Sequence, residues 1–197
     1  LERSSTSTSA IHPCSGTETA AILFTSGSTG PSKGVIYTHS MFEAQVDRLR
    51  DLYGIEPGEI DLCTFPLFAL FAPALGMTSI IPDMDPTRPA LVDPSKIFEV
   101  FEDFGVTNLF GSPALLRRLA PAGIERGIVL SSLKRVVSAG APASTRTLEQ
   151  FSNLLAPPAQ IFTPYGATES LPVASIGSDE VLTETRRQTD RGEGVCV

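Results

Sequence analysis

The stretch Ala-Ala-Ile-Leu-Phe-Thr-Ser-Gly-Ser-Thr-Gly-Pro-Ser-Lys-Gly, residues 20–34, decides the fold of this chain. Its first five residues are apolar and predict a short buried strand, after which the run breaks into hydroxyls and glycines. Glycines let a backbone approach an anion, hydroxyls and exposed N–H groups can donate to phosphate oxygens, and a lysine supplies a point charge. The stretch therefore predicts a phosphate-binding loop formed by Thr25, Ser26, Gly27, Ser28, Thr29, Gly30, Lys33 and Gly34.

Two other interpretations of this loop fit less well. A Walker A loop requires Gly-Lys-Ser/Thr, whereas here Ser32 precedes Lys33 and Gly34 follows it. A Ser/Gly-rich linker is not normally preceded by an apolar strand. Thr-Ser-Gly-Ser-Thr-Gly followed by Lys-Gly instead resembles the phosphate loop of the adenylate-forming superfamily, which includes acyl-CoA synthetases, peptide-synthetase adenylation domains and luciferases. That family usually has proline immediately before the lysine, whereas this chain has Pro31-Ser32-Lys33.

Composition narrows the class of protein. The 197 residues are 42% hydrophobic and 19% charged, which indicates a soluble globular protein with a real core. The net charge of -7 argues against a nucleic-acid or anionic-membrane partner, because both need a basic surface. Cys14, Cys63 and Cys196 are too few and too scattered for a disulfide framework or a zinc site, and we expect reduced thiols in the cytoplasm. No apolar run is long enough to span a membrane.

The N-terminal part predicts a tail, a hairpin and a helix. Residues 1–19 are rich in Ser and Thr, and we expect them to be extended or poorly ordered. Residues 34–37 predict a return strand that closes a hairpin. A helix capped by Thr38 or Ser40 follows and ends at Gly54, with Phe42, Val46, Leu49 and Tyr53 on one face. His39 lies at the helix start, where we expect a capping or packing role rather than a catalytic one.

The rest of the chain alternates strands and helices. Strands are predicted at residues 62–67, 80–81, 106–110, 133–137 and 160–163. Helices are predicted to begin at Asp93-Pro94 and Ser112-Pro113 and to span 145–155. Their buried positions are predicted to be Ile97, Val100, Phe101, Phe104, Leu115, Leu116 and Leu119, while residues 82–89, rich in proline and charge, predict a loop. The alternation predicts an α/β fold with a largely parallel β-sheet flanked by helices.

In such sheets the ligand lies beyond the carboxyl ends of the strands. Five segments each follow a predicted strand, and we expect them to converge on one site. They are the phosphate loop, the apolar cluster that begins at Phe65, Gly111-Ser112, residues 138–142 and residues 165–169.

A second motif, Tyr165-Gly166-Ala167-Thr168-Glu169, supports this expectation. Tyrosine can stack on a purine, threonine can donate to phosphate, and glutamate can hold Mg²⁺ beside that phosphate. Alone the string fits an ordinary turn equally well, but in order after the phosphate loop it resembles a second defining motif of the adenylate-forming superfamily. Ser138-Ala139-Gly140-Ala141-Pro142 resembles the segment between them. The resemblance implies ATP and Mg²⁺ as cofactors. The backbone of Gly140, Ala141 and Pro142 would line the adenine and Tyr165 would cover it, while Gly166 and Ala167 would shape the turn. Thr168 would contact the α-phosphate and Glu169 would bind the metal.

Several segments, among them residues 65–77, 81–89 and 189–197, resemble the olefin-pathway β-lactone synthetases (OleC). That resemblance implies activation of a long-chain 2-alkyl-3-hydroxy acid as its acyl-adenylate, closure to a β-lactone, and release of AMP and pyrophosphate. Phe65, Phe68 and Phe71 would form the wall of an alkyl pocket, and an assembly with enzymes of the same pathway is expected. A long-chain acyl-CoA or acyl-AMP ligase shares the same nucleotide motifs and stays open as an alternative.

The resemblance covers a partial, N-terminal core of an adenylate-forming enzyme. Residues 20–197 would be part of the AMP-binding domain, without the C-terminal lid domain that carries the family's lysine essential for adenylation. A nucleotide-binding fragment without turnover is therefore a third interpretation, and we expect these 197 residues alone not to complete adenylation.

Overall fold

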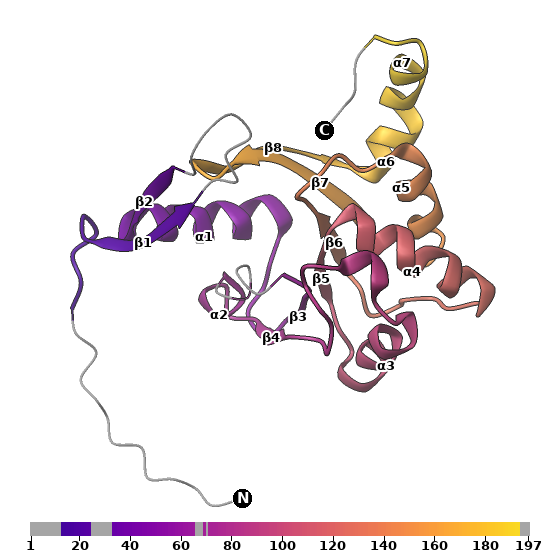
Figure 1. Cartoon of the computed structure of the whole chain (residues 1–197), viewed down its shortest axis with the longest axis horizontal. Coiled ribbons are helices and arrows are strands. Elements are labelled where there is room, and N and C mark those ends of the chain that lie inside the picture. Colours follow the sequence, from indigo (N-terminus) through magenta and orange to yellow (C-terminus); the bar gives the residue numbers. More distant parts are fainter. Residues whose placement is uncertain (1–12, 25–32, 66–68, 70, 194–197) are drawn as a thin grey trace, which may run out of the picture. The chain divides into compact units, whose positions relative to one another are not determined.

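A computed structural model of the chain describes residues 13–24, 33–65, 69 and 71–193 (Figure 1). The chain divides into two compact units, Leu1–Gln45 and Val46–Val197. Most of the predicted phosphate loop, from Thr25 to Gly30, lies outside the described residues, as does Phe68.

The first unit contains the predicted hairpin. Strand β1 (Thr19–Phe24) pairs antiparallel with β2 (Gly34–Thr38), with Ile22 opposite Ile36 and Phe24 opposite Gly34. The prediction of a strand here is confirmed, but the prediction that it is buried is wrong: Ile22 and Phe24 are 54% and 70% exposed. Alternate side chains of a strand point to opposite faces, and in this hairpin only one face is packed.

Helix α1 (His39–Tyr53) follows β2 directly and confirms the predicted helix. Thr38 Oγ1 accepts a hydrogen bond from the backbone N–H of Met41 at 3.4 Å, and this bond caps the first turn. Gly54 adopts a left-handed conformation with φ of 59°, which ends the helix as predicted. The backbone N–H of His39 donates to the carbonyl of Glu18 at 3.1 Å, and the role of its side chain stays a prediction.

The second unit is built on a sheet of six described strands in the order β4-β3-β5-β6-β7-β8 (Figure 1). The first five are mutually parallel, and β8 runs antiparallel to β7, which confirms the α/β fold with a largely parallel sheet. The strands are β3 (Ile60–Cys63), β4 (Thr78–Ile80), β5 (Asn108–Gly111), β6 (Arg135–Ser138), β7 (Gln160–Ala167) and β8 (Ser170–Gly177).

The predicted strand boundaries need correction. Strand β3 lies earlier than the predicted 62–67, whereas β5 and β6 lie one or two residues later than 106–110 and 133–137. Strands β5 and β6 begin on buried polar residues, Asn108 and Arg135, which an apolar pattern cannot assign to a strand. Strand β4 ends at Ile80, and Ile81, predicted to be in the strand, is 61% exposed.

The helices of the second unit that follow α1 are α2 (Phe71–Ala74), α3 (Pro94–Phe104), α4 (Pro113–Glu125), α5 (Thr145–Ser152), α6 (Ser178–Glu180) and α7 (Arg186–Asp190), with a 3₁₀ turn η2 (Pro89–Leu91) and a π-helical turn η3 (Val181–Thr185). Helices α3, α4 and α5 pack on one face of the sheet and α2 on the other. The predicted starts of α3 and α4 are confirmed, because Asp93 and Ser112 accept hydrogen bonds from the backbone N–H groups of Ser95 and Leu115. Within the part of the chain that the structure describes, no helix has the length and apolarity needed to cross a membrane.

The larger core lies where one face of the sheet meets α3, α4 and α5. Its fully buried strand residues are Leu62, Leu109, Val136 and Ile161, and its helix residues include Ile97, Phe98, Phe101, Leu115, Leu116, Leu119, Leu148 and Phe151. The prediction of Phe104 as buried is wrong, because the helix ends there and its side chain is 53% exposed. A second core on the opposite face contains Tyr53, Ile55, Ala72, Leu75, Met77 and Val137.

Candidate functional site

Four of the five predicted loops leave one edge of the sheet. Cys63 is in register with Phe110 and Phe110 with Val137, and Val137 is in register with Phe162, so the carboxyl ends of β3, β5, β6 and β7 are consecutive neighbours. The fifth predicted loop, residues 25–32, lies outside the described residues between β1 and β2, which form a separate two-stranded sheet, so its convergence with the other four loops stays a prediction. The sheet of the second unit therefore presents the segments predicted to bind adenine and metal, and the first unit contains the predicted phosphate loop.

The first residue after β3, Thr64, is held against β5. The backbone N–H and the hydroxyl of Thr64 both donate to the carbonyl of Phe110, at 3.3 and 2.7 Å. Phe65 is 45% exposed, whereas Phe71 is half-buried and packs against the second core. The prediction that these rings line an alkyl pocket stays a prediction.

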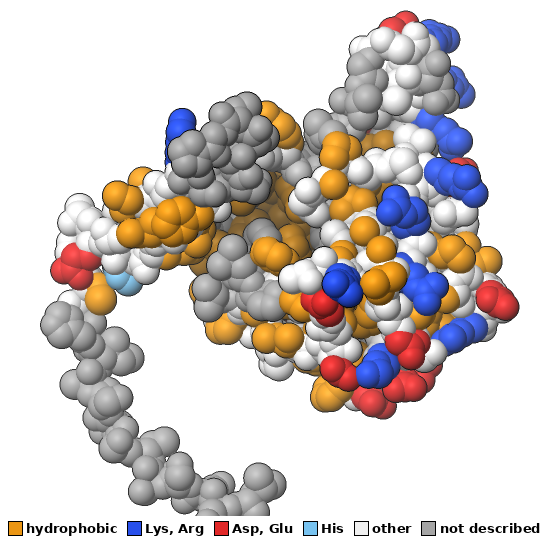
Figure 2. Space-filling view, in the orientation of Figure 1, with side chains coloured by type: hydrophobic (Ala, Val, Ile, Leu, Met, Phe, Trp, Pro, Cys, Tyr) orange, Lys and Arg blue, Asp and Glu red, His pale blue; other side chains and the backbone are white. Residues whose placement is uncertain are grey.

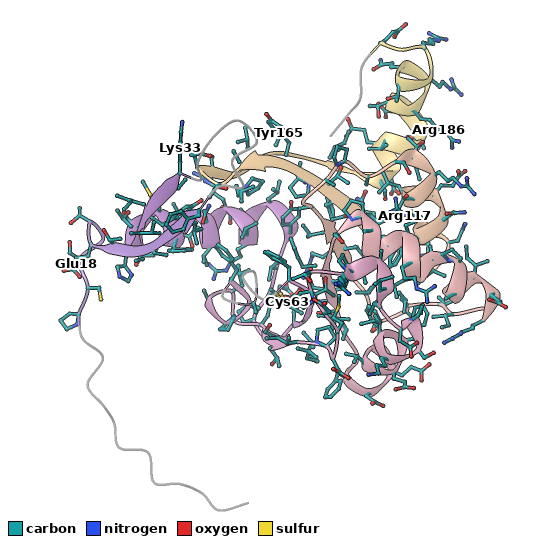
Figure 3. The ribbon with its side chains drawn as sticks, viewed as in Figure 1. Glu18, Lys33, Cys63, Arg117, Tyr165 and Arg186 are labelled. Carbon is teal, nitrogen blue, oxygen red and sulfur yellow. The ribbon has the colours of Figure 1, made fainter. Side chains whose placement is uncertain are left out.

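Cys63, at the end of β3, is a buried thiol that donates to the carbonyl of Phe65 at 2.9 Å (Figure 3). Burial, reinforced by the nearby Asp61 carboxylate, raises the pKa of Cys63 to about 12. The thiolate is therefore not formed near neutral pH, and Cys63 is a packing residue rather than a nucleophile.

The turn after β6 is open to solvent. Gly140, Ala141 and Pro142 are exposed, and Gly140 has φ of 93°, a conformation that favours glycine. Ser144 then caps α5 by accepting a hydrogen bond from the backbone N–H of Thr147 at 3.2 Å. That the backbone of residues 140–142 lines an adenine stays a prediction.

The motif from Tyr165 to Glu169 was predicted as a loop, and the structure corrects this prediction. Strand β7 continues to Ala167, whose partner in β8 is Ser170, and Thr168-Glu169 form the turn of the hairpin. A bulge lies between Tyr165 and Ala167, and a Cβ at Gly166 would approach the carbonyl oxygen of Ser170 to 2.6 Å. Glycine is therefore required at this position by the close approach of the two strands.

The hairpin leaves the chemical groups of its motif accessible. The ring of Tyr165 is 56% exposed, and Glu169 is exposed at the turn. Within the described residues, no group of three His, Cys, Asp or Glu side chains is arranged to hold a metal. A single carboxylate still fits Mg²⁺ that arrives with a triphosphate, since Mg²⁺ usually takes one or two carboxylates together with substrate phosphates and water.

Lys33 is exposed and lies immediately before β2, in the first unit (Figure 3). Tyr165, Thr168 and Glu169 lie in the second unit. That Lys33 and Glu169 act on one triphosphate stays a prediction.

A groove of about 390 Å³ lies apart from these motifs and is lined by Asp83, Met84, Asp85, Arg88, Leu91, Val92, Asp93 and Lys96. Its charged groups are already paired: Lys96 Nζ lies 2.6 Å from Asp83 Oδ2, and this hydrogen bond lowers the pKa of Asp83. None of the described residues predicted for the site lines this groove.

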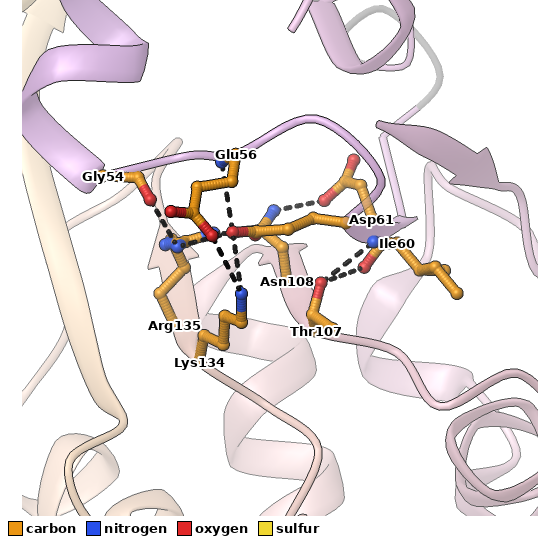
Figure 4. Close-up of polar contacts among 9 residues, drawn as sticks. Gly54, Glu56, Ile60, Asp61, Thr107, Asn108, Lys134 and Arg135 are labelled. Carbon is orange, nitrogen blue, oxygen red and sulfur yellow. Dashed lines mark hydrogen bonds and ion pairs between the residues drawn. The ribbon is translucent and has the colours of Figure 1, made fainter. Parts of the chain in front are cut away.

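Sequence reasoning missed a buried polar row at the opposite, amino-terminal edge of the sheet (Figure 4). Asp61, Asn108 and Arg135 are in register on β3, β5 and β6, and Asn108 Nδ2 donates to Asp61. The Arg135 guanidinium pairs with the buried Glu59 and donates to the carbonyl of Gly54 at 3.1 Å. This row connects the end of α1 to the sheet and lies away from the ligand edge, so its role is structural.

The pKa values of the two carboxyl groups of the row shift in opposite directions. Burial acts to raise the pKa of Glu59, but hydrogen bonds from Arg135 and Lys134 and the charge of Arg135 hold it below its ordinary value. Burial raises the pKa of Asp61 to about 6, against smaller opposing effects of Asn108 and Arg135. The available sequence signal was one polar residue close to the start of each strand: Asp61 is the second residue of β3, and Asn108 and Arg135 are the first residues of β5 and β6.

The fold and motifs define the class of the protein. Residues 2–194 match the AMP-binding enzyme family, and the chain belongs to that family. Among solved structures, O-succinylbenzoate coenzyme A synthetase from Bacillus subtilis, in complex with AMP, matches with a TM-score of 0.69 over 86% of this chain and 34% of its own; at 22% identity this likeness concerns the fold.

Two curated relatives narrow the kind of enzyme within this family. An olefin β-lactone synthetase from Stenotrophomonas maltophilia is 53% identical over 92% of this chain and 32% of its own length. A probable CoA ligase from Humulus lupulus is 32% identical over 89% of this chain and 32% of its length. The chain thus spans about a third of the curated relatives it matches, and the resemblance to adenylate-forming enzymes of the β-lactone synthetase kind is confirmed.

Proposed function

We propose that the complete protein is an ATP-dependent β-lactone synthetase of the cytoplasm. It activates a long-chain 2-alkyl-3-hydroxy acid and closes it to a β-lactone, with AMP and pyrophosphate as the other products. The observation that carries this proposal is the identity of 53% with an olefin β-lactone synthetase, against 32% with a CoA ligase. The thiols of Cys14 and Cys63 agree with a reducing compartment.

Each residue of the motifs has a defined task in this reaction. Tyr165 stacks on the adenine that the backbone of residues 140–142 lines, and Thr168 donates to the α-phosphate. Lys33 offsets the charge that develops on the departing pyrophosphate. Mg²⁺, held by Glu169 and the phosphates, supplies further charge neutralisation when bound. A carboxylate oxygen of the acid attacks the α-phosphorus while the bond to pyrophosphate breaks.

Lactone formation needs only positioning. The 3-hydroxyl oxygen of the bound acyl-adenylate attacks the carbonyl carbon, its proton passes to solvent, and the bond to AMP breaks. Holding the two groups of one molecule in contact gives a high effective concentration, so no external nucleophile is required. Phe65, Phe68 and Phe71 contribute apolar surface for the alkyl chains, and we propose that enzymes of the same pathway assemble with this one.

The test uses the full-length enzyme with ATP, Mg²⁺ and a long-chain 2-alkyl-3-hydroxy acid, without any thiol. We expect equal amounts of AMP, pyrophosphate and a β-lactone, identified by mass and by its strained carbonyl stretch. Lys33→Ala and Glu169→Gln should each lower turnover about 10²–10³-fold. Lys96→Ala, which removes an exposed lysine of the groove, is the matched control and should leave turnover unchanged.

A long-chain acyl-CoA ligase is the second candidate function, favoured by the CoA-ligase relatives. It predicts a strict requirement for coenzyme A and a thioester product. Both enzymatic proposals fail if neither the lactone nor the thioester forms and if Lys33→Ala and Glu169→Gln release no less AMP than the parent protein does. A nucleotide-binding role is then left. For the 197-residue chain alone we propose nucleotide binding without completed adenylation.

A further inference from the structure

We propose that Ser138 is a positioning residue of the nucleotide site. When a nucleotide is bound, the Ser138 hydroxyl accepts a hydrogen bond from the backbone N–H of Gly140 and fixes the turn of residues 139–142. This role rests on the proposed function, in which the backbone of residues 140–142 lines the adenine. Ser138 is the last residue of β6 and only 2% exposed, so it is a buried polar residue at the edge of the sheet that the predicted loops leave.

The hydroxyl of Ser138 has no hydrogen-bond partner within the part of the chain that the structure describes. The buried side-chain oxygens of the second unit that share this property are Ser79 Oγ, Asn108 Oδ1, Ser138 Oγ and Ser152 Oγ. Ser79 and Asn108 lie toward the amino-terminal edge of the sheet, and Ser152 is the last residue of α5. Ser138 is the member of this set at the carboxyl edge, where it is in register with Gly111.

A buried hydroxyl without a partner has a cost in free energy. The group loses its hydrogen bonds to water on folding, and the folded protein returns none to it. Alanine is nearly the same size as serine and would avoid this cost. A partner that forms only in a ligand-bound state accounts for a hydroxyl at this position.

The turn that follows Ser138 contains a suitable partner. A serine hydroxyl commonly accepts a hydrogen bond from the backbone N–H two residues further along the chain, which here belongs to Gly140. Gly140 is exposed and has φ of 93°, and glycine changes its backbone angles at little cost, so the turn can move to form this bond. A nucleotide that contacts residues 140–142 would favour the bonded arrangement, because a ligand stabilises the conformation that it binds better.

The exposed surface of the second unit is a weaker candidate for a ligand site. Figure 2 shows hydrophobic, basic and acidic side chains next to one another over α3 and α4, so this face carries charges of both signs there. In the groove beside α3, Lys96 is paired with Asp83 and Arg88 with Asp85. The Ser138 hydroxyl, in contrast, has an unused capacity for hydrogen bonding next to a segment predicted to bind nucleotide.

The experiment measures the Kd for AMP of the purified full-length protein by titration calorimetry, without any acid substrate. Ser138→Ala removes the hydroxyl, and Ser138→Cys keeps the size of the side chain but is a much weaker acceptor. Each should raise the Kd about 5–10-fold, as expected for the loss of one hydrogen bond. Ser152→Ala is the matched control and should leave the Kd unchanged, because its hydroxyl is also buried and unpaired but lies at the far end of α5.

Two further measurements separate a positioning role from a structural one. Without nucleotide, Ser138→Ala should unfold at the same temperature as the parent protein or a higher one, because it loses no hydrogen bond. In hydrogen exchange, AMP should slow the exchange of the amides of residues 139–141 at least about 5-fold more in the parent protein than in Ser138→Ala.

An unchanged Kd for AMP in both Ser138 variants would overturn the proposal and leave the proposed function intact. A lower unfolding temperature of Ser138→Ala without nucleotide would also overturn it, because the hydroxyl would then be structural. If the parent protein itself does not bind AMP, the proposed function fails and the role of Ser138 fails with it.

Discussion

The hairpin of the first unit and the sheet of the second are built from the same residue types and differ in what covers them. Leu62, Leu109, Val136 and Ile161 are completely buried between the sheet and its helices, whereas Ile22 and Phe24 are more than half exposed. Full burial of such a side chain contributes about 1.5–3 kcal/mol, so the sheet gains this repeatedly and the outer face of the hairpin hardly at all. The comparison teaches that an apolar run predicts a strand without telling what packs against it.

The largest expected effect comes from the ionic pair at the amino-terminal edge of the sheet. Arg135→Met should destabilise the second unit by about 3–5 kcal/mol, because the buried charge of Glu59 would lose its buried partner and keep only the half-exposed Lys134. Urea denaturation of the purified protein measures this change. Lys134→Met is the matched control: its ammonium contacts the same Glu59 at 3.3 Å but is half-exposed, and its loss should cost less than about 1 kcal/mol. Equal losses of stability in the two variants would contradict the assignment of Arg135 as the residue that neutralises the buried Glu59.

Hydrogen exchange tests the comparison directly. In the 197-residue chain, the backbone amides of β5 and β6 should exchange about 100-fold or more slowly than those of β1 and β2, because a half-solvated hairpin opens locally at low cost. Mass spectrometry of peptides from the two regions measures the difference. Hairpin amides as protected as those of β5 would show that the two regions are equally stable and break the comparison.

Asp61→Asn should stabilise the protein near pH 7 by roughly 2–3 kcal/mol. Because the folded pKa of Asp61 is about 6 and its ordinary value is 3.8, the folded state binds the extra proton between these values. Stability therefore falls as the pH rises from about 4 to about 6, and Asn removes this dependence while keeping the shape beside Asn108. Thermal unfolding across this pH range measures it.

Asp83→Asn is the control for that experiment, since the pKa of Asp83 is shifted in the opposite direction from that of Asp61. The hydrogen bond from Lys96 lowers the pKa of Asp83, so its contribution to stability is present above the ordinary pKa and is lost as the pH falls through the lowered one. A stability that rises with pH between 4 and 6 in the parent protein, and is unchanged by Asp61→Asn, would refute the buried-carboxyl assignment.

The smallest effect is expected at the hairpin of β7 and β8. Gly166→Ala should cost about 1–3 kcal/mol, because the new Cβ would lie 2.6 Å from the carbonyl oxygen of Ser170 and the strands would have to separate. Gly127→Ala is a useful control: it has φ of 64° but open space around its Cβ position, so it reports backbone strain without a collision. A Gly166→Ala protein as stable as the parent would show that this turn tolerates side chains.

Local signals predicted much of the second unit. The caps at Asp93 and Ser112, the end of α1 at Gly54, and the buried Leu115, Leu116 and Leu119 follow from residue type and spacing, and the structure confirms them. The strand starts at Asn108 and Arg135 could not be predicted, since their burial depends on partners 47 and 76 residues away. For the candidate site, sequence placed the motifs after strands but not on the hairpin of β7 and β8.

The sequence by itself determined the alternation of strands and helices, because glycines, caps and apolar periods act within a few residues along the chain, and its motifs carried the resemblance to the AMP-binding family. Only the tertiary structure decided which apolar faces are covered, which polar groups are buried in register, and that the two strands beside the predicted phosphate loop form a sheet of their own. These features depend on pairing between distant segments, and no local pattern encodes the partner.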